Sequence, residues 1–151
     1  MTTTMNGIDD LKAHIGQHLG YSDWREITQD QVNAFADATG DHQWIHVDVE
    51  RAKQGPFGGP IAHGYLTLSL TPMLVSEAVR VEGFKMGVNY GINRLRFPAP
   101  APVGSKLRAG VKMLACEDVA GGVQLTYEVT FEVEGGDKPA CVADILFRYY
   151  T

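Results

Sequence analysis

The sequence predicts an α+β fold in which an antiparallel β-sheet of about five strands wraps around one long central α-helix. The C-terminal half alternates between apolar and polar residues, as strands with one buried and one solvated face do. The middle of the chain holds a stretch that is apolar on nearly every helical face, which is typical of a helix enclosed by other elements. With 151 residues, 44% of them hydrophobic and 21% charged, the composition indicates a single domain over residues 1–151. Residues 1–7 are expected to be flexible.

The N-terminal part contains one helix with clear boundaries. A first strand is expected near residues 18–27, and a helix follows over 28–39. Thr28 with Gln31 three residues later is a capping-box pattern. Gly40 suits the left-handed position that ends a helix. Residues at i, i+3, i+4 and i+7 spacing supply the buried face, namely Val32, Phe35, Ala36 and Thr39.

The apolar helix is expected from about Ala62 to Arg80. Before it, Asp48 is placed to cap a short helical turn over 49–54, and a loop rich in glycine and proline follows. Pro72 removes one backbone donor, so we expect a kink inside the long helix rather than a break.

The remaining elements are predicted to be strands, because apolar and polar residues alternate in them. They cover residues 86–97, 105–115, 122–135 and 141–149, separated by turns rich in glycine and proline. A sheet that curls around a central helix is the hotdog arrangement.

Charge and composition exclude several classes of partner. The formal net charge of −5 shows no basic excess, so we expect no nucleic-acid partner. The N-terminus lacks the basic and apolar regions of a signal peptide, and the most apolar segment, 61–79, is too polar to be a membrane span. Cys116 and Cys141 form no CxxC pair and are expected to be reduced thiols of a cytoplasmic protein.

Residues 39–48, TGDHQWIHVD, concentrate proton-handling groups just after the helix stop at Gly40. They allow three interpretations: a polar loop with incidental histidines, a metal site using His42 and His46, or an acid/base pair of Asp41 and His46 that holds a water. The metal site would need the glutamate of an HExxH motif or a third ligand of clear spacing, so we expect none. Five residues apart, Asp41 and His46 converge only where the backbone bends, and Gly40 together with the bulky residues between them favours a bend.

A second motif supports the acid/base interpretation. The segment PIAHGYL places Gly64 where the apolar helix begins. Without a Cβ, Gly64 lets a substrate oxygen approach its backbone N–H closely. Such a donor would stabilise a carbonyl that becomes an enolate. The alternative is a glycine that only permits close packing of two chain segments.

Together these motifs resemble a known family. TGDHQWIH, followed by an IAHG segment whose glycine lies eighteen residues after His46, is similar to the MaoC-like, type 2 (R-specific) enoyl-CoA hydratases, whose motif is close to S/T-G-D-x-N-P-I/L-H. The stretch YGINRLRFPAP from Tyr90 is similar to the NodN-like branch. The resemblance implies a hotdog fold, a homodimer, an acyl-CoA thioester as substrate with CoA as part of it, no separate cofactor and no metal. It also implies that Asp41 and His46 grip the catalytic water and that the Gly64 amide forms the oxyanion hole.

The implied reaction is reversible syn addition of water to a trans-2-enoyl-CoA, giving the (R)-3-hydroxyacyl-CoA in fatty-acid metabolism. One departure stands out, since Gln43-Trp44 replaces the Asn-Pro of the motif. For the CoA phosphates the sequence offers several cations near the proline bend: Arg94, Arg96, Lys106 and Arg108, with Lys85 and Arg51 further away. A hotdog acyl-CoA thioesterase and a non-catalytic acyl-CoA-binding or dehydratase-partner subunit are the alternative functions.

Overall fold

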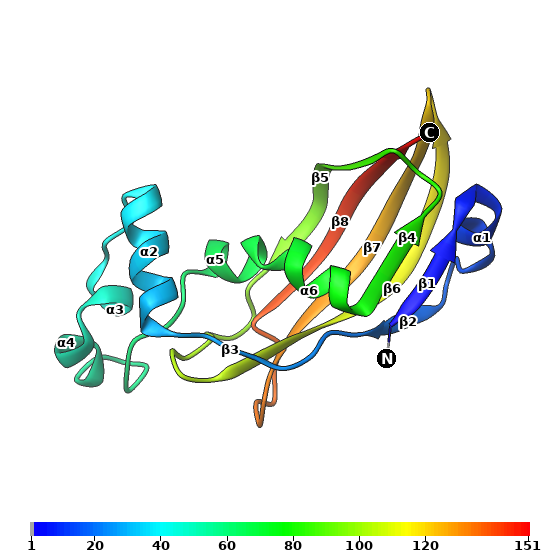
Figure 1. Ribbon diagram of the computed structural model, residues 1–151. Helices are drawn as coiled ribbons and strands as arrows, with labels where there is room; N and C mark the ends of the chain where they lie inside the picture. Colours follow the sequence, from blue (N-terminus) through cyan, green and yellow to red (C-terminus); the bar gives the residue numbers. More distant parts are fainter. Residues whose placement is uncertain (1) are drawn as a thin grey trace.

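In the computed structural model, which describes residues 2–151, the predicted antiparallel sheet is present with six strands (Figure 1). Four strands follow the order β6-β7-β8-β5, and the short strands β2 and β3 both pair with β6. The bounds are β2 His18–Tyr21, β3 Arg25–Glu26, β5 Met86–Arg96, β6 Lys106–Val119, β7 Gly122–Val133 and β8 Cys141–Tyr150. The α+β hotdog prediction and the positions of the long strands are therefore confirmed.

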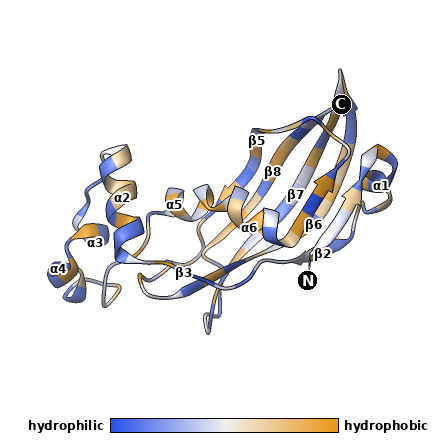
Figure 2. Ribbon diagram, viewed as in Figure 1, coloured by the Kyte–Doolittle hydropathy of each residue, from blue (hydrophilic) through white to orange (hydrophobic). Residues whose placement is uncertain are grey.

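The core lies on one face of this sheet, where the alternating apolar residues point. In the central strand β7 the inward row is fully buried, and it consists of Val123, Leu125, Tyr127, Val129 and Phe131. Each buried side chain of this size stabilises the fold by about 1.5–3 kcal/mol relative to exposure. Figure 2 shows the same alternation as bands of contrasting hydropathy along the strands. The sheet therefore owes its register to the burial of one face, because a slip of one residue would expose the whole row.

The predicted long helix is divided into two short helices that run along this apolar face (Figure 1). α5 spans Gly64–Ser69, α6 spans Thr71–Ala78, and Leu70 joins them. Pro72 has no N–H to donate to the Leu68 carbonyl, and the Thr71 hydroxyl donates to that oxygen instead, at 2.5 Å. The prediction of a kink without a break was thus wrong, as was the extension of the helix to Arg80.

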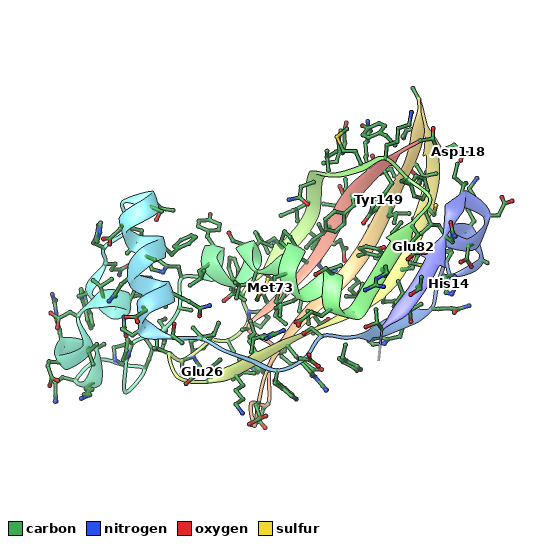
Figure 3. The ribbon with its side chains drawn as sticks, viewed as in Figure 1. His14, Glu26, Met73, Glu82, Asp118 and Tyr149 are labelled. Carbon is green, nitrogen blue, oxygen red and sulfur yellow. The ribbon has the colours of Figure 1, made fainter. Side chains whose placement is uncertain are left out.

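The expectation of a helix enclosed by other elements holds on one side of the helix pair only. Leu74 and Ala78 are fully buried, but Tyr65 is 66% exposed and Met73, labelled on α6 in Figure 3, is 42% exposed. One side of the helix pair therefore packs on the sheet while the other presents large apolar side chains to the surface.

Three further helices lie at one end of the molecule, beyond the start of α5 (Figure 1). They are α2 Gln29–Thr39, α3 Trp44–Val47 and α4 Val49–Lys53. The capping box is present, because the Thr28 hydroxyl accepts from the Gln31 amide while the Gln31 side chain accepts from the Thr28 amide. Gly40 ends α2 with φ at +84°, and the Asp48 carboxylate caps α4 by accepting from the Arg51 amide. The predicted boundaries of this region are confirmed.

The N-terminal elements differ from the expectation of a flexible segment over residues 1–7. Thr3–Asn6 form β1, which pairs in parallel with β4 (Val79–Glu82), and Gly7 begins α1 (Gly7–Ala13). Met1 lies outside the described residues. The Lys12 ammonium forms an ion pair with Asp118 of β6, labelled in Figure 3, at 2.9 Å and thereby ties α1 to the sheet.

The chemistry of the two cysteines agrees with the expectation of reduced thiols. Cys116 and Cys141 are free and buried. Burial raises the pKa of Cys141 to about 12 and also raises that of Cys116, so both side chains stay protonated near neutral pH. Within residues 2–151, every helix is too short or too polar to cross a membrane.

Candidate active site

The site forms where two chain segments meet, at the end of the molecule that carries α2 to α4. The first segment runs from Asp41, just past the Gly40 stop, to His46 in α3. The second runs from Ile61 to Gly64, the first residue of α5. A backbone hydrogen bond from the Ile61 amide to the Ile45 carbonyl oxygen, 3.0 Å long, joins the two segments directly. The bend expected between Asp41 and His46 is present, since residues 41–43, which belong to no helix or strand, lead into the single turn of α3.

Two histidine side chains also join the two segments, and each bonds to the backbone of the opposite segment. The Nδ1 atom of His46 lies 2.6 Å from the carbonyl oxygen of Ile61 in the second segment. The Nε2 atom of His63 lies 2.9 Å from the backbone carbonyl oxygen of Asp41 in the first segment. The rings themselves stack, with centroids 3.9 Å apart and planes inclined by 25°. Each segment thus contributes one ring that bonds to the backbone of the other.

These contacts decide the tautomers of both rings. A carbonyl oxygen only accepts, so the nitrogen facing it must carry the hydrogen. Neutral His46 is therefore protonated on Nδ1 and offers the lone pair of Nε2, whereas neutral His63 is protonated on Nε2 and offers the lone pair of Nδ1. Burial lowers the pKa of His46 and the charge of a protonated His63 acts in the same direction, while the Ile61 carbonyl and Asp41 oppose the shift. The balance favours a neutral His46 that can accept a proton.

The Asp41 carboxylate completes a group of three. One carboxylate oxygen of Asp41 and one ring nitrogen each of His46 and His63 lie within 4.8 Å of one another. The centre of a triangle with sides of 4.8 Å is ~2.8 Å from each corner, which is a hydrogen-bond distance. The Asp41 Oδ1 atom accepts from the Gln43 amide at 3.3 Å, an arrangement that orients the carboxylate locally. The pair predicted from the sequence is thus brought together, at a separation that one bridging water can span.

Gly64 lies next to this group, on the wall of a cleft of about 310 Å³ that His46 also lines. As the first residue of α5 it has an N–H without an intrahelical acceptor. A Cβ at Gly64 would come within 3.1 Å of three ring carbons of Phe97, so a side chain there would require this ring to shift slightly. The rest of the wall is mostly apolar: Phe57, Ile61, Ala62, Thr67, Phe97, Pro98, Ala99, Pro100, Ala101 and Ala140. The arrangement offers an amide donor and a proton acceptor at one apolar cleft.

His42, which the sequence offers as a partner of His46 in a metal site, takes no part in the group. Its Nε2 atom lies 3.0 Å from a carboxylate oxygen of Asp37 on the surface of α2, and this contact raises the pKa of His42. Instead, the third candidate ligand is His63, from a segment that the spacing of the first motif does not cover.

The departure at Gln43-Trp44 is accommodated at the start of α3. Trp44 occupies the first helical position, where proline is also favoured because no amide is needed there. Its ring packs against Gly55 and stacks on the Arg51 guanidinium, 4.3 Å from the ring centroid. Trp44 therefore anchors α3 to α4. The Gln29 side chain adds a bond from α2, donating to the His46 carbonyl oxygen at 2.9 Å.

Sequence reasoning missed His63 as a member of the site, although it lies directly before Gly64. It is 2% exposed, and its ring packs between His46 and Phe35 of α2, whose centroid is 4.8 Å away. A histidine at the first turn of a predicted core helix was the available signal. Its contact with Asp41 joins residues 22 positions apart, so spacing within one motif gives no indication of it.

Comparison with known proteins identifies the family. Residues 10–134 match the model of the MaoC like domain. The chain is 55% identical over 147 residues to 3-hydroxyacyl-thioester dehydratase Z of Mycobacterium tuberculosis (strain ATCC 25618 / H37Rv), covering 97% of both chains. It is 44% identical over 138 residues to Nodulation protein N of Rhizobium leguminosarum bv. viciae, covering 89% of this chain and 86% of that protein. Among solved structures, the (R)-hydratase from A. caviae involved in PHA biosynthesis superposes with a TM-score of 0.68 at 26% identity, covering 88% of this chain and 94% of that one. The chain therefore belongs to the MaoC-like family of hydratases and dehydratases.

Proposed function

We propose that the protein is an (R)-specific enoyl-CoA hydratase, which adds water reversibly across the double bond of a trans-2-enoyl-CoA. The observation that carries the proposal is the convergence of Asp41 and His46 beside the Gly64 amide, at a cleft whose wall is mostly apolar. Relatives named as a 3-hydroxyacyl-thioester dehydratase and an (R)-hydratase support the same reaction in its two directions.

In the proposed mechanism the thioester carbonyl oxygen accepts a hydrogen bond from the Gly64 N–H. This donor polarises the conjugated double bond and stabilises the enolate that develops on the carbonyl oxygen. Water held by Asp41 and His46 attacks C3, and one member of the pair takes its proton as the C–O bond forms. A proton then passes from the pair to C2 on the same face, which gives syn addition. Dehydration follows the same steps in reverse.

The proposed reaction uses a water and needs no metal or separate cofactor. Zinc would require ligand atoms at ~2.0–2.2 Å from a common centre. Three atoms up to 4.8 Å apart accommodate the longer bonds of a water more readily. The carbonyl bond that fixes the tautomer of His46 leaves the lone pair of its Nε2 atom for this purpose.

A second cleft of about 340 Å³ offers cations for the CoA phosphates. Arg94 and Arg96 of β5 line it with Pro98, which also lines the catalytic cleft, and with Glu128 and Asp144. By contrast, Arg108 is held in an ion pair with Glu132, with N and O 2.7 Å apart. Of the cations that the sequence offers, we propose Arg94 and Arg96 for the phosphates.

We also propose that the protein is a cytoplasmic homodimer that acts in fatty-acid metabolism. β5 forms one edge of the sheet, so its outer backbone groups are free to pair with a second copy. Large apolar side chains are exposed on and near this edge, namely Tyr65, Met86, Tyr90, Ile92 and Phe97. A partner that covers them would remove the apolar surface from water.

Incubation with crotonyl-CoA tests the reaction. Hydration removes the enoyl absorbance and releases no thiol, and chromatography on a chiral column identifies the 3-hydroxybutyryl product as the R form. Release of free CoA would instead identify a thioesterase. Unchanged absorbance at all enoyl chain lengths would support the non-catalytic alternative.

A further inference from the structure

We propose that His63 is a positioning residue for this reaction, which holds the Asp41 segment in register with the ring of His46. The kinetic part of this inference rests on the proposed function. The structural part rests only on how the two chain segments of the site are joined.

Two histidine side chains connect the segments of the site reciprocally. His46 donates from Nδ1 to the Ile61 carbonyl oxygen, and His63 donates from Nε2 to the Asp41 carbonyl oxygen. Without the second bond, the segment from Asp41 to Gln43 would be held by local contacts: its own turn, the stop at Gly40, the surface contact of His42 with Asp37 and the first turn of α3. The His63 bond therefore connects the residue that supplies the carboxylate to the residue that precedes the Gly64 amide.

The ring of His63 also fixes the orientation of His46. One face of the His63 ring packs against the His46 ring, with centroids 3.9 Å apart, and Phe35 packs against His63 at 4.8 Å. His63 is thus a rigid support between α2 and the catalytic imidazole. Rotation of the His46 ring would require movement of a side chain that is itself 2% exposed and bonded to the backbone.

The polar atoms of the His63 ring show why the position holds a histidine and not an apolar ring. The Nδ1 atom of His63 is buried and has no hydrogen-bond partner among the described residues. An unpaired buried polar atom is costly, and a phenylalanine would fill a similar space without that cost. The bond from Nε2 to Asp41 is the one contact of the ring that phenylalanine lacks. We infer that this bond is what the site requires.

Two substitutions separate the bond from the packing. His63→Phe keeps an aromatic ring between Phe35 and His46 and loses the donor to Asp41. His63→Gln keeps a donor near the position of Nε2 and loses the ring. His42→Phe is the matched control, because His42 lies in the same segment but its ring bonds to Asp37 on the surface of α2.

With crotonyl-CoA as the probe, His63→Phe is expected to lower kcat by about 10²-fold with little change in KM, because misplacement of a catalytic group by ~1 Å has this effect. His63→Gln is expected to keep kcat within about tenfold of the wild type, and His42→Phe to leave it unchanged. A merely structural role would lower the melting temperature or the folded fraction, while kcat per folded molecule stayed the same. Wild-type kcat in folded His63→Phe would overturn the proposal.

A measurement on the wild-type protein keeps the test independent of variant folding. The ring ¹⁵N shifts of His63 are expected to show the tautomer protonated on Nε2 at neutral pH. The tautomer protonated on Nδ1 would overturn the proposed connection to Asp41, whatever the kinetics. If the wild-type protein left crotonyl-CoA unchanged while His63 showed the Nε2 tautomer, the proposed function would fail and the structural part of the inference would stand.

Discussion

The Nδ1 atom of His46 lies 2.6 Å from the carbonyl oxygen of Ile61, and this bond directs the free lone pair of the ring to Nε2. The donor and the acceptor belong to the two segments that form the site. The same contact therefore holds the segments together and prepares the imidazole to accept a proton. Five predictions rest on this arrangement and on the elements that support it.

The activity should decrease on the acidic side, at a pH below the ordinary pKa of histidine. Desolvation lowers the pKa of His46, so the neutral ring persists below about pH 6.5. In a profile of kcat/KM against pH, the acidic limb is expected below this value. An acidic limb above pH 6.5 would contradict a neutral, desolvated His46.

The same shift makes the stability depend on pH in a known direction. Unfolded His46 binds a proton at a higher pH than the folded residue does, so the free energy of unfolding decreases as the pH falls below about 6.5. The decrease ends once the pH lies below the lowered pKa of the folded state. Urea unfolding of the wild type and of His46→Gln across this range measures the effect, and identical pH dependence would exclude His46 as its source.

Asp41→Asn and His46→Gln should each lower kcat by at least about 10²-fold, because each removes one group of an acid/base pair. Both residues handle one water, so the double variant should lose little more activity than either single variant. Steady-state hydration of crotonyl-CoA measures all three. Fully multiplicative losses would show that the two residues act independently.

Gly64→Ala should lower kcat by at least about tenfold with little effect on stability, since a methyl group would obstruct the approach to the amide donor. Phe97, which the added Cβ would meet at 3.1 Å, is 41% exposed and has room to shift. Gly59→Ala is the control, because a Cβ there meets nothing within 4 Å. Equal activities of the two variants would remove the Gly64 amide from the mechanism.

Thr28→Ala should lower the free energy of unfolding by about 1 kcal/mol, because the start of α2 loses the acceptor for the Gln31 amide. Thr28→Ser retains a hydroxyl and should retain most of the stability. Denaturant unfolding compares the two variants. A loss of equal size in both would show that the Thr28 methyl group, and not the cap, stabilises the protein.

The sequence predicted the long strands and α2 well, because their signals lie in neighbouring residues. Strict alternation gives β7 one buried face. Thr28 and Gln31 mark the start of α2 and Gly40 marks its end. The long apolar helix was predicted less well. Its periodicity indicated burial correctly for Leu74 and Ala78. The division at Leu70 depends on Pro72, which has no N–H and leaves the Leu68 carbonyl oxygen to the Thr71 hydroxyl.

The N-terminal elements could not be predicted for a different reason. β1 is four residues long and its partner β4 begins at Val79, more than seventy residues away. A short strand acquires its structure from a distant neighbour, and its own pattern is too brief to show that it will pair.

For the site, the sequence by itself determined the types of chemical group and their order along the chain: a carboxylate after a helix stop, an imidazole five residues later, and a glycine amide at the start of a core helix. Only the tertiary structure decided which groups meet. In the folded chain His63 contacts His46 and Asp41, whereas His42 contacts Asp37 on the surface. Carbonyl groups of the opposite segment determine which nitrogen of His46 and of His63 carries the proton. The physical reason is that caps and periodicity act over a few residues, whereas a hydrogen bond between residues 22 positions apart forms only after the fold has brought their segments together.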